Sequence, residues 1–97
     1  MKLNLYAIFD TASGVYDGPF KCRSDPEAIR TFRGIATDAD HPIGKNPEDF
    51  HLARVGSWND NKGELVPETP EFLATALECV ADARNVVNLS DKEILNA

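Results

Sequence analysis

The stretch Gly44–Phe50, with the sequence GKNPEDF, holds the residues that come nearest to a phosphate-binding loop. In such a loop, a glycine precedes the Gly-Lys pair by five residues, a Ser or Thr follows the lysine, and a helix comes next. Ala39 stands where that first glycine is needed, and Asn46 stands where the hydroxyl is needed. Pro47 favours an extended chain that leads into a strand. We therefore assign no nucleotide site to this stretch.

The adjacent carboxylates of Glu48 and Asp49 suggest acid-base catalysis or metal binding. Neighbouring side chains of an extended chain point apart, and nothing in the sequence predicts the burial that separates two carboxyl pKa values. The histidines and cysteines complete no zinc pattern. Solvated turn acids are the simpler interpretation. We expect no catalytic residue, no metal site and no cofactor, and we do not expect an enzyme.

Aromatic and basic residues form the remaining chemical pattern. Single-stranded nucleic acid is held when bases stack on aromatic rings while Lys or Arg neutralise the phosphates. Tyr16 and Trp58 lie near the ends of predicted strands, where either stacking or a core position is open. Phe9, Phe32 and Phe72 are expected in the core. The predicted DNA-binding set adds six cations to the two rings: Lys21, Arg23, Arg30, Arg33, Lys45 and Arg54.

An acidic surface is the second candidate. Residues 59–97 carry three basic and eight acidic side chains, a balance of −5, whereas residues 1–58 carry seven and eight, a balance of −1. The net charge of −6 argues against a generic nucleic-acid binder, but the N-terminal part alone does not if its basic groups share a face. The acidic C-terminal half is typical of a solvated face or a protein-interaction surface. Glu71, Glu78 and Asp82 are predicted to share the polar face of a helix and to contact a protein partner.

The elements that must position these residues begin with two strands. Residues 3–9 alternate between the two faces of a strand, and we expect one set in the core: Leu3, Leu5, Ala7 and Phe9. A turn at Thr11–Gly14 leads to a second strand that starts at Val15. The Gly18-Pro19 pair interrupts this strand, because proline donates no ladder hydrogen bond, so it is predicted to be short or at a sheet edge.

The first helix is predicted to begin at Ser24-Asp25-Pro26-Glu27, with Asp25 as the cap, and to end near Thr37. Its buried stripe comprises Ala28, Ile29, Phe32, Ile35 and Ala36. Residues 38–49 are predicted to form a loop. Residues 50–58 form a third strand whose apolar phase drifts, which indicates a bulge near its middle.

A short fourth strand is predicted at Glu64–Val66. Thr69-Pro70-Glu71 repeats the cap, proline and acid pattern and predicts a second long helix. Its apolar stripe comprises Phe72, Leu73, Ala76, Leu77, Val80, Ala83 and Val87. Residues 88–97 are expected to be a loosely held tail in which Ser90-Asp91-Lys92-Glu93 has capping-box spacing.

These elements follow the order ββαββα and predict an α+β fold, with a mostly antiparallel four-stranded sheet and two helices on one face. The 97 residues suit one domain, 1–97. No apolar run reaches the roughly 18 residues that span a membrane, and no signal peptide is evident, so we expect a soluble cytoplasmic protein. Cys22 and Cys79 are expected to be reduced and buried.

Three stretches together resemble a known family: the opening MKLNLYAIFD, the Pro19-Phe20 pair, and KNPEDFHLARVGSWNDNKGEL. The chain resembles, over residues 1–66, the small non-structural protein of the gokushovirus branch of the microviruses, which are tailless phages with single-stranded DNA genomes. Phe50 stands where that family often has tyrosine. The resemblance implies a protein of the host bacterial cytoplasm that assists the change to single-stranded progeny DNA synthesis and binds DNA.

Two functions therefore stand as hypotheses. The first is a replication accessory protein that binds single-stranded DNA through the aromatic and basic set. The second is an acidic adaptor that engages a host or phage replication protein without binding DNA. Neither involves a membrane. In both cases, pairing of exposed strand edges could produce a homodimer.

Overall fold

Two strands at the start of the chain, β1 (Lys2–Asp10) and β2 (Val15–Cys22), form an antiparallel hairpin. In this computed structural model, which describes residues 1–83, β3 (Phe50–Asn59) pairs with the other side of β1, and β4 (Glu64–Thr75) pairs with β3. The sheet has the order β2-β1-β3-β4, and every neighbouring pair is antiparallel. This confirms that β2 is an edge strand.

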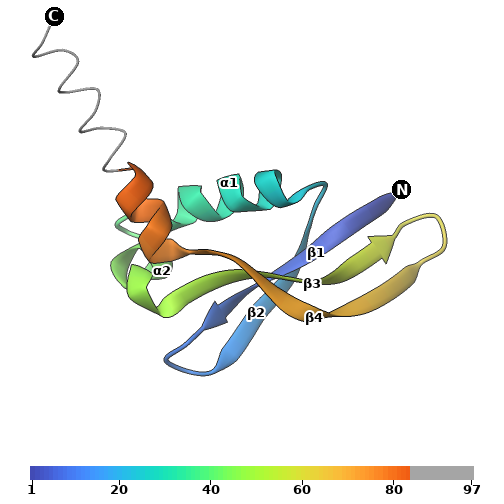
Figure 1. Cartoon of the computed structure of the whole chain (residues 1–97), viewed down its shortest axis with the longest axis horizontal. Helices are drawn as coiled ribbons and strands as arrows, with labels where there is room; N and C mark the ends of the chain where they lie inside the picture. Colours follow the sequence, from blue (N-terminus) through green and yellow to red (C-terminus); the bar gives the residue numbers. More distant parts are fainter. Residues whose placement is uncertain (84–97) are drawn as a thin grey trace, which may run out of the picture.

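The helices lie on one side of this sheet (Figure 1). They are α1 (Asp25–Ala36), the single-turn α2 (Pro42–Lys45), the 3-10 turn η1 (Pro47–Asp49), and a helix that begins at residue 76 and is described to residue 83. The predicted α+β fold with the order ββαββα is therefore confirmed. The predicted tail at 88–97 and its capping-box stretch lie outside the described residues.

Helix α1 begins at Asp25, one residue earlier than predicted, and Ser24 is its N-cap. The Ser24 side chain accepts a hydrogen bond from the backbone N–H of Glu27, at 3.3 Å. Asp25, which was predicted to cap the helix, directs its carboxylate toward the sheet instead. The helix ends at Ala36 with Thr37 as its C-cap, as predicted. Its buried stripe is also confirmed, because Ala28, Phe32 and Ala36 are buried while Ile29 and Ile35 pack at its margins.

The face prediction for β1 was wrong for Leu3, Leu5 and Phe9, whereas Ala7 is buried as expected. Tyr6 is fully buried under α1, and Ile8 packs against the same cluster, whereas Leu5 and Phe9 lie on the opposite side of the sheet. Alternation alone fixes two faces of a strand but does not say which one the helices cover. The choice depends on the Tyr6 hydroxyl, which reaches the first residue of α1.

The bulge predicted in the third strand is confirmed. Leu5 pairs with Gly56 and Tyr6 pairs with Arg54, so Val55 is an extra residue on β3. The bulge breaks the alternation of β3, so Trp58 lies on the same face as Leu3. This break explains why the apolar residues of β3 do not keep to one set of alternate positions. A Cβ on Gly56 would lie only 2.5 Å from the carbonyl oxygen of Val66, so glycine permits the close approach of β4.

The segment predicted as a loop at 38–49 contains the two short helices α2 and η1. Gly44 makes this packing possible, because a Cβ there would lie 1.8 Å from the carbonyl oxygen of Asp38. The glycine of the GKNPEDF stretch thus serves close backbone packing. His41 caps α2 by accepting a hydrogen bond from the backbone N–H of Ile43 at its Nδ1 atom, at 3.1 Å.

The second long helix was predicted in the wrong place. Residues 69–75 continue β4, and the helix starts only at residue 76. The Thr75 hydroxyl accepts from the N–H of Glu78, and the Glu78 carboxylate accepts from the N–H of Thr75, which is a capping box. Pro67 and Pro70 are tolerated because β4 is an edge strand with an irregular register at this point.

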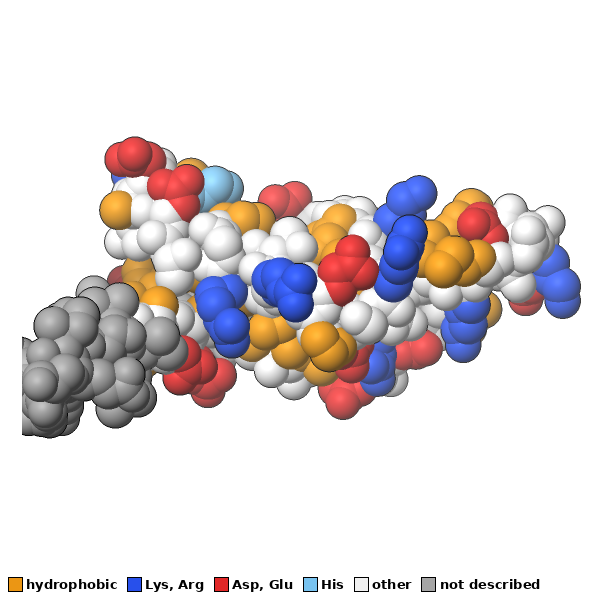
Figure 2. Space-filling view, turned by 90° about the horizontal axis from the view of Figure 1, so that it is seen from above, with side chains coloured by type: hydrophobic (Ala, Val, Ile, Leu, Met, Phe, Trp, Pro, Cys, Tyr) orange, Lys and Arg blue, Asp and Glu red, His pale blue; other side chains and the backbone are white. Residues whose placement is uncertain are grey.

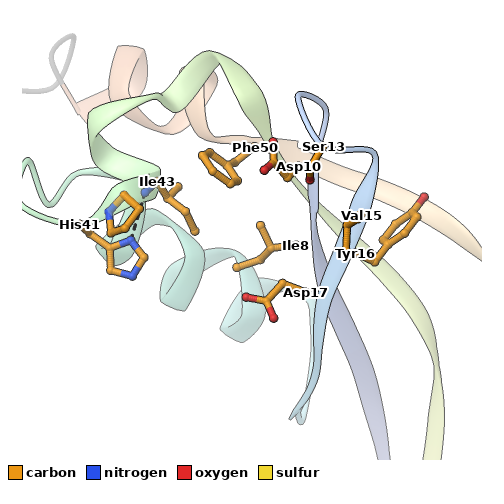
Figure 3. A pocket seen from close by; sticks show the side chains of 10 residues that line it. Ile8, Asp10, Ser13, Val15, Tyr16, Asp17, His41, Ile43 and Phe50 are labelled. Atoms are coloured by element: carbon orange, nitrogen blue, oxygen red, sulfur yellow. Dashed lines mark hydrogen bonds between the residues drawn. The ribbon is translucent and has the colours of Figure 1, made fainter.

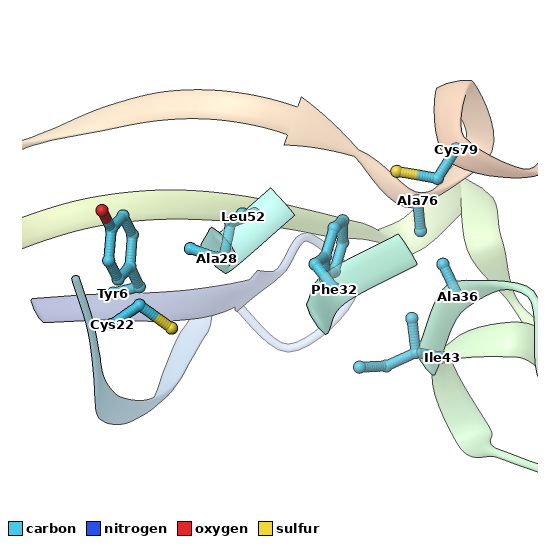
Figure 4. Close-up of a cluster of buried hydrophobic side chains, with 9 residues drawn as sticks. All are labelled: Tyr6, Cys22, Ala28, Phe32, Ala36, Ile43, Leu52, Ala76 and Cys79. Carbon is cyan, nitrogen blue, oxygen red and sulfur yellow. The ribbon is translucent and has the colours of Figure 1, made fainter. Parts of the chain in front are cut away.

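The core lies between the sheet and the helices (Figure 4). Its buried side chains are Tyr6, Cys22, Ala28, Phe32, Ala36, Ile43, Leu52, Ala76 and Cys79. Both cysteines are free and buried, as predicted. Burial is the main factor that raises the pKa of each thiol, so neither is activated as a nucleophile.

Two glycine substitutions test this account of the helices. Gly34→Ala should stabilise the protein by about 0.5–1 kcal/mol, because Gly34 lies within α1 and nothing stands near its missing Cβ. Gly44→Ala should destabilise it by about 1–3 kcal/mol, because the new methyl group collides with the Asp38 carbonyl. Urea denaturation measures both values, and equal effects would contradict the predicted role of Gly44.

Candidate functional site

One face of the sheet, here called the open face, has no helix of residues 1–83 packed on it (Figure 1). Strand register places its side chains in rows that run across all four strands. The residues of the open face include Leu3, Leu5, Ala7, Phe9, Tyr16, Lys21, His51, Ala53, Trp58, Leu65 and Phe72. Most of these side chains are apolar or aromatic, which is unusual for a sheet face that helices leave uncovered.

Four rings gather at one end of the open face, and we call Phe9, Tyr16, His51 and Phe72 the ring cluster. The centroids of Phe9 and Tyr16 lie 4.6 Å apart, and those of Phe9 and Phe72 lie 6.0 Å apart. Tyr16 and Phe72 are nearly parallel at 6.5 Å, and His51 meets Phe72 edge-on at 5.8 Å. These distances are those of interacting aromatic pairs, so the rings support one another.

The ring cluster is accessible from solvent. Phe72 is 52% exposed and Tyr16 is 41% exposed. The expectation of a core position is thus wrong for Phe72 and confirmed for Phe32, which is fully buried. Phe72 is exposed because β4 continues as a strand and places it opposite Ala53.

Phe9 and His51 are functional candidates that sequence reasoning missed. Phe9 was expected in the core, yet it lies on the open face beside Tyr16. A signal was present, because residues equally distant from a hairpin turn pair with each other, and Phe9 and Tyr16 flank the turn at 11–14 symmetrically. His51 lies on the open face for the same reason, because it is the partner of Phe9 on β3.

Trp58 lies on the open face, but far from the ring cluster. It pairs with Leu3 on one side and Leu65 on the other, and it is half-buried. Leu3 and Phe9 are six positions apart on β1, which corresponds to about 20 Å along a strand. Trp58 and the ring cluster therefore mark opposite ends of one apolar surface.

The six predicted cations do not gather on one face. Lys21 lies on the open face opposite Leu5. Arg30 and Arg33 are exposed on α1, on the other side of the sheet, and Figure 2 shows that side with its Lys and Arg side chains spread out and acidic side chains between them. Arg23 precedes α1, and Lys45 ends α2.

Arg54 points to the covered side of the sheet and contacts three carboxylates. Its guanidinium lies 2.7 Å from Asp25 and 3.5 Å from Glu68, and it also pairs with Glu71. The hydrogen bond to Asp25 is the main factor that raises the pKa of Arg54. The geometry gives this residue a structural role, since it joins α1, β3 and β4.

Tyr6 extends this network into the core. Its hydroxyl donates to Asp25 at 2.6 Å and accepts from the side-chain amide of Asn4 at 3.1 Å. Burial, followed by the hydrogen bond to Asp25, raises the pKa of Tyr6 to about 12. The Asp25 carboxylate therefore receives hydrogen bonds from both Tyr6 and Arg54.

The predicted acidic surface is divided between two elements. Glu71 lies on β4 and not on a helix, because the helix begins later than expected, and it pairs with Arg54. Glu78 and Asp82 do lie on the final helix, where the Glu78 carboxylate is part of the capping box. Within residues 1–83, no three His, Cys, Asp or Glu side chains come together as a possible metal site.

A comparison with protein families connects this arrangement to phages. The model of a family described as Phage ORF5 protein matches residues 3–79. The chain belongs to this family. The match includes all four strands of this ORF5-family protein except Lys2, and so both the open face and the covered face.

Two further comparisons found no match, neither among curated proteins nor among solved structures. In the described part of this phage ORF5-family protein, none of the helices has the length and apolar character needed to cross a membrane.

The Tyr6 hydroxyl provides a stability test. Tyr6→Phe should lower the free energy of unfolding by about 1–2 kcal/mol, because Asp25 and Asn4 each lose a hydrogen-bond partner. Tyr16→Phe is the matched control and should change it by less than about 0.5 kcal/mol, because its ring is exposed. Urea denaturation of both variants at neutral pH is the measurement, and equal losses would contradict the role given to Tyr6.

The same variant gives a pH test. The pKa of Tyr6 is about 12 in the folded chain against an ordinary 10.0, so the folded state holds this proton more tightly than the unfolded state does. The resulting stabilisation is complete below pH 10 and is lost as the pH rises toward 12. The stability advantage of the wild type over Tyr6→Phe should therefore shrink across this range, and a constant difference would contradict it.

Proposed function

We propose that this phage protein is a non-structural accessory protein of genome replication that binds single-stranded DNA on its open face. In this proposal it assists the change to single-stranded progeny DNA synthesis in the bacterial cytoplasm, as in the gokushovirus branch that its sequence resembles. The observation that carries the proposal is the ring cluster, in which exposed aromatic rings stand on a sheet face that no helix of residues 1–83 covers.

Stacking supplies most of the binding energy in this proposal. Tyr16 and Phe72 present the exposed rings, and Phe9 and His51 hold them in place. Each stacked base contributes about 1–3 kcal/mol, and every base has a flat face that can stack. Binding of this kind is tolerant of sequence, which suits a protein that must act along a whole genome.

Phosphate contacts contribute less. The net charge of −6 disfavours a polyanion, and Lys21 is the cation that shares the open face with the rings. Opposite Leu5, Lys21 stands between the ring cluster and the Trp58 end of the surface. A strand that runs from the ring cluster past Lys21 toward Trp58 would contact all three. Arg54 takes no part, because its guanidinium is held by three carboxylates.

The acidic adaptor has less support from the geometry. Its proposed surface needed three free carboxylates on one helix face, but Glu71 pairs with Arg54 from β4 and Glu78 caps the final helix. Asp82 remains exposed on that helix. We therefore favour DNA binding over the adaptor.

Fluorescence titration with single-stranded oligothymidylate tests the proposed DNA site. We expect quenching of Trp58 and about tenfold or greater weakening in Tyr16→Ala and in Phe72→Ala, because each loses a stacked base. Leu77→Ala, which shortens an exposed side chain on the final helix, is the matched control and should bind normally. Failure of the wild type to bind at low salt, or normal binding by both ring variants, would overturn the proposal.

Salt dependence separates stacking from charge. The slope of log affinity against log salt should be between about −0.7 and −1.5, since each phosphate contact on a single strand contributes about 0.7. Lys21→Gln should flatten this slope, whereas Arg30→Gln should leave it unchanged because Arg30 lies across the sheet. A steep slope that is reduced by Arg30→Gln would place the DNA on the helical side instead.

A further inference from the structure

A cavity of about 360 Å³ opens on the covered side of the sheet. It lies between α2 and the β1–β2 hairpin (Figure 3). Ile8, Ile43 and Phe50 supply apolar surface, and Asp10 and Asp17 supply carboxylates. Tyr16 also contributes to the lining, but its ring points away from the cavity, so the cavity and the ring cluster lie on opposite sides of β2.

The cavity exists because the helices cover the sheet unevenly. Ile43 of α2 is buried against the core, but Val15 on the neighbouring edge strand is 59% exposed. At the hairpin end of β2, no helix of residues 1–83 therefore packs on the covered side of this strand. A volume of this size is at the small end of the range for sites that hold small ligands or single side chains.

The carboxylates alternate with apolar side chains across the hairpin. Ile8 pairs with Asp17, and Asp10 pairs with Val15, so the two acids occupy one diagonal of a four-residue block. Diagonal neighbours in an antiparallel pair are about 7–8 Å apart, close enough for one cation between them to contact both. In residues 1–83, no ion pair reaches either carboxylate.

Other groups around the cavity do not offset this negative charge. His41 uses its Nδ1 as an acceptor for the N–H of Ile43, so its neutral ring carries the hydrogen on Nε2. One oxygen of Asp10 accepts from the N–H of Ala12 at 2.9 Å, and its other oxygen has no such partner within the hairpin turn. The site therefore combines two negative charges with apolar walls.

We propose that this cavity binds a primary aliphatic ammonium group together with its hydrocarbon stem. The stem packs on Ile8, Val15 and Ile43, and the ammonium lies between Asp10 and Asp17, where charge-assisted hydrogen bonds hold it. A free polyamine and a lysine side chain of a partner share this chemistry. An anion is repelled, and a neutral apolar ligand would leave the carboxylates desolvated without a partner.

Titration of the full chain with cadaverine, followed by amide chemical shifts in NMR spectra, tests the site. Shifts should concentrate at residues 8–17 and 41–50. Two matched ligands test the two contributions separately. Ammonium chloride has the charge without the stem, and 1-pentanol has the stem without the charge. Both should bind at least about tenfold more weakly than cadaverine. Equal binding of either one, or scattered shifts with cadaverine, would overturn the proposal.

A second titration with Nα-acetyl-lysine amide distinguishes the two sources. Similar affinity for this compound and for cadaverine would assign the site to a lysine side chain of a partner. Several-fold tighter binding of cadaverine would assign it to a free polyamine. Absence of binding by both would contradict the shared chemistry.

Variants complete the test. Asp17→Asn and Val15→Ser should each weaken cadaverine binding by about threefold to fivefold, through loss of charge and of stem contact respectively. Glu64→Gln removes the same charge from the far hairpin and should have no effect. Asp17→Asn should also leave oligothymidylate affinity within about twofold, so failure of either site can be recognised separately. Unchanged cadaverine binding by both Asp17→Asn and Val15→Ser would overturn the assignment.

Discussion

The contact between Arg54 and Asp25 is the interaction on which the arrangement of the other elements depends. Arg54 stands at the bulge of β3, and its three carboxylate partners come from the start of α1 and from β4. Asp25 in turn accepts from Tyr6, which is fully buried. This network fixes α1 over one face of the sheet. It also fixes β4 to β3 in a region where local sequence favours a helix.

Coverage on one side explains why this small protein has two distinct surfaces. The helices that bury Tyr6, Phe32 and Leu52 leave the opposite face without a layer within residues 1–83. Apolar side chains there support one another laterally, as the contacts among the rings show. On the helical side, coverage is incomplete near the β1–β2 hairpin, where the cavity lies.

Sequence reasoning identified the elements whose signals are local. The cap region and end of α1, the bulge in β3 and the edge position of β2 each follow from residue type and spacing. The face of β1 and the end of β4 depend on contacts between distant residues. Thr69-Pro70-Glu71 has every feature of a helix start, yet Glu71 gains Arg54 as a partner by remaining in a strand.

In the candidate site, too, some positions follow from local sequence and others depend on contacts between distant residues. Tyr16 and Lys21 were identified from the sequence and lie on the open face, whereas Arg30 and Arg33 lie across the sheet from them. The sequence does not say on which side of a sheet a helical arginine will lie. Phe72 was missed because its exposure depends on where β4 ends.

The extra residue at Val55 has a consequence for how the family can tolerate changes in chain length. If β3 kept this residue but alternated regularly through it, every side chain beyond that point would exchange faces with its neighbour. Trp58 would turn toward the helical side, and Ser57, which is now buried, would turn outward. Deletion of Val55 itself would remove the bulge and keep Trp58 opposite Leu3, because Arg54 and Gly56 already pair with consecutive residues of β1. The bulge is therefore the position in β3 where the chain can lose one residue without moving side chains to the other face.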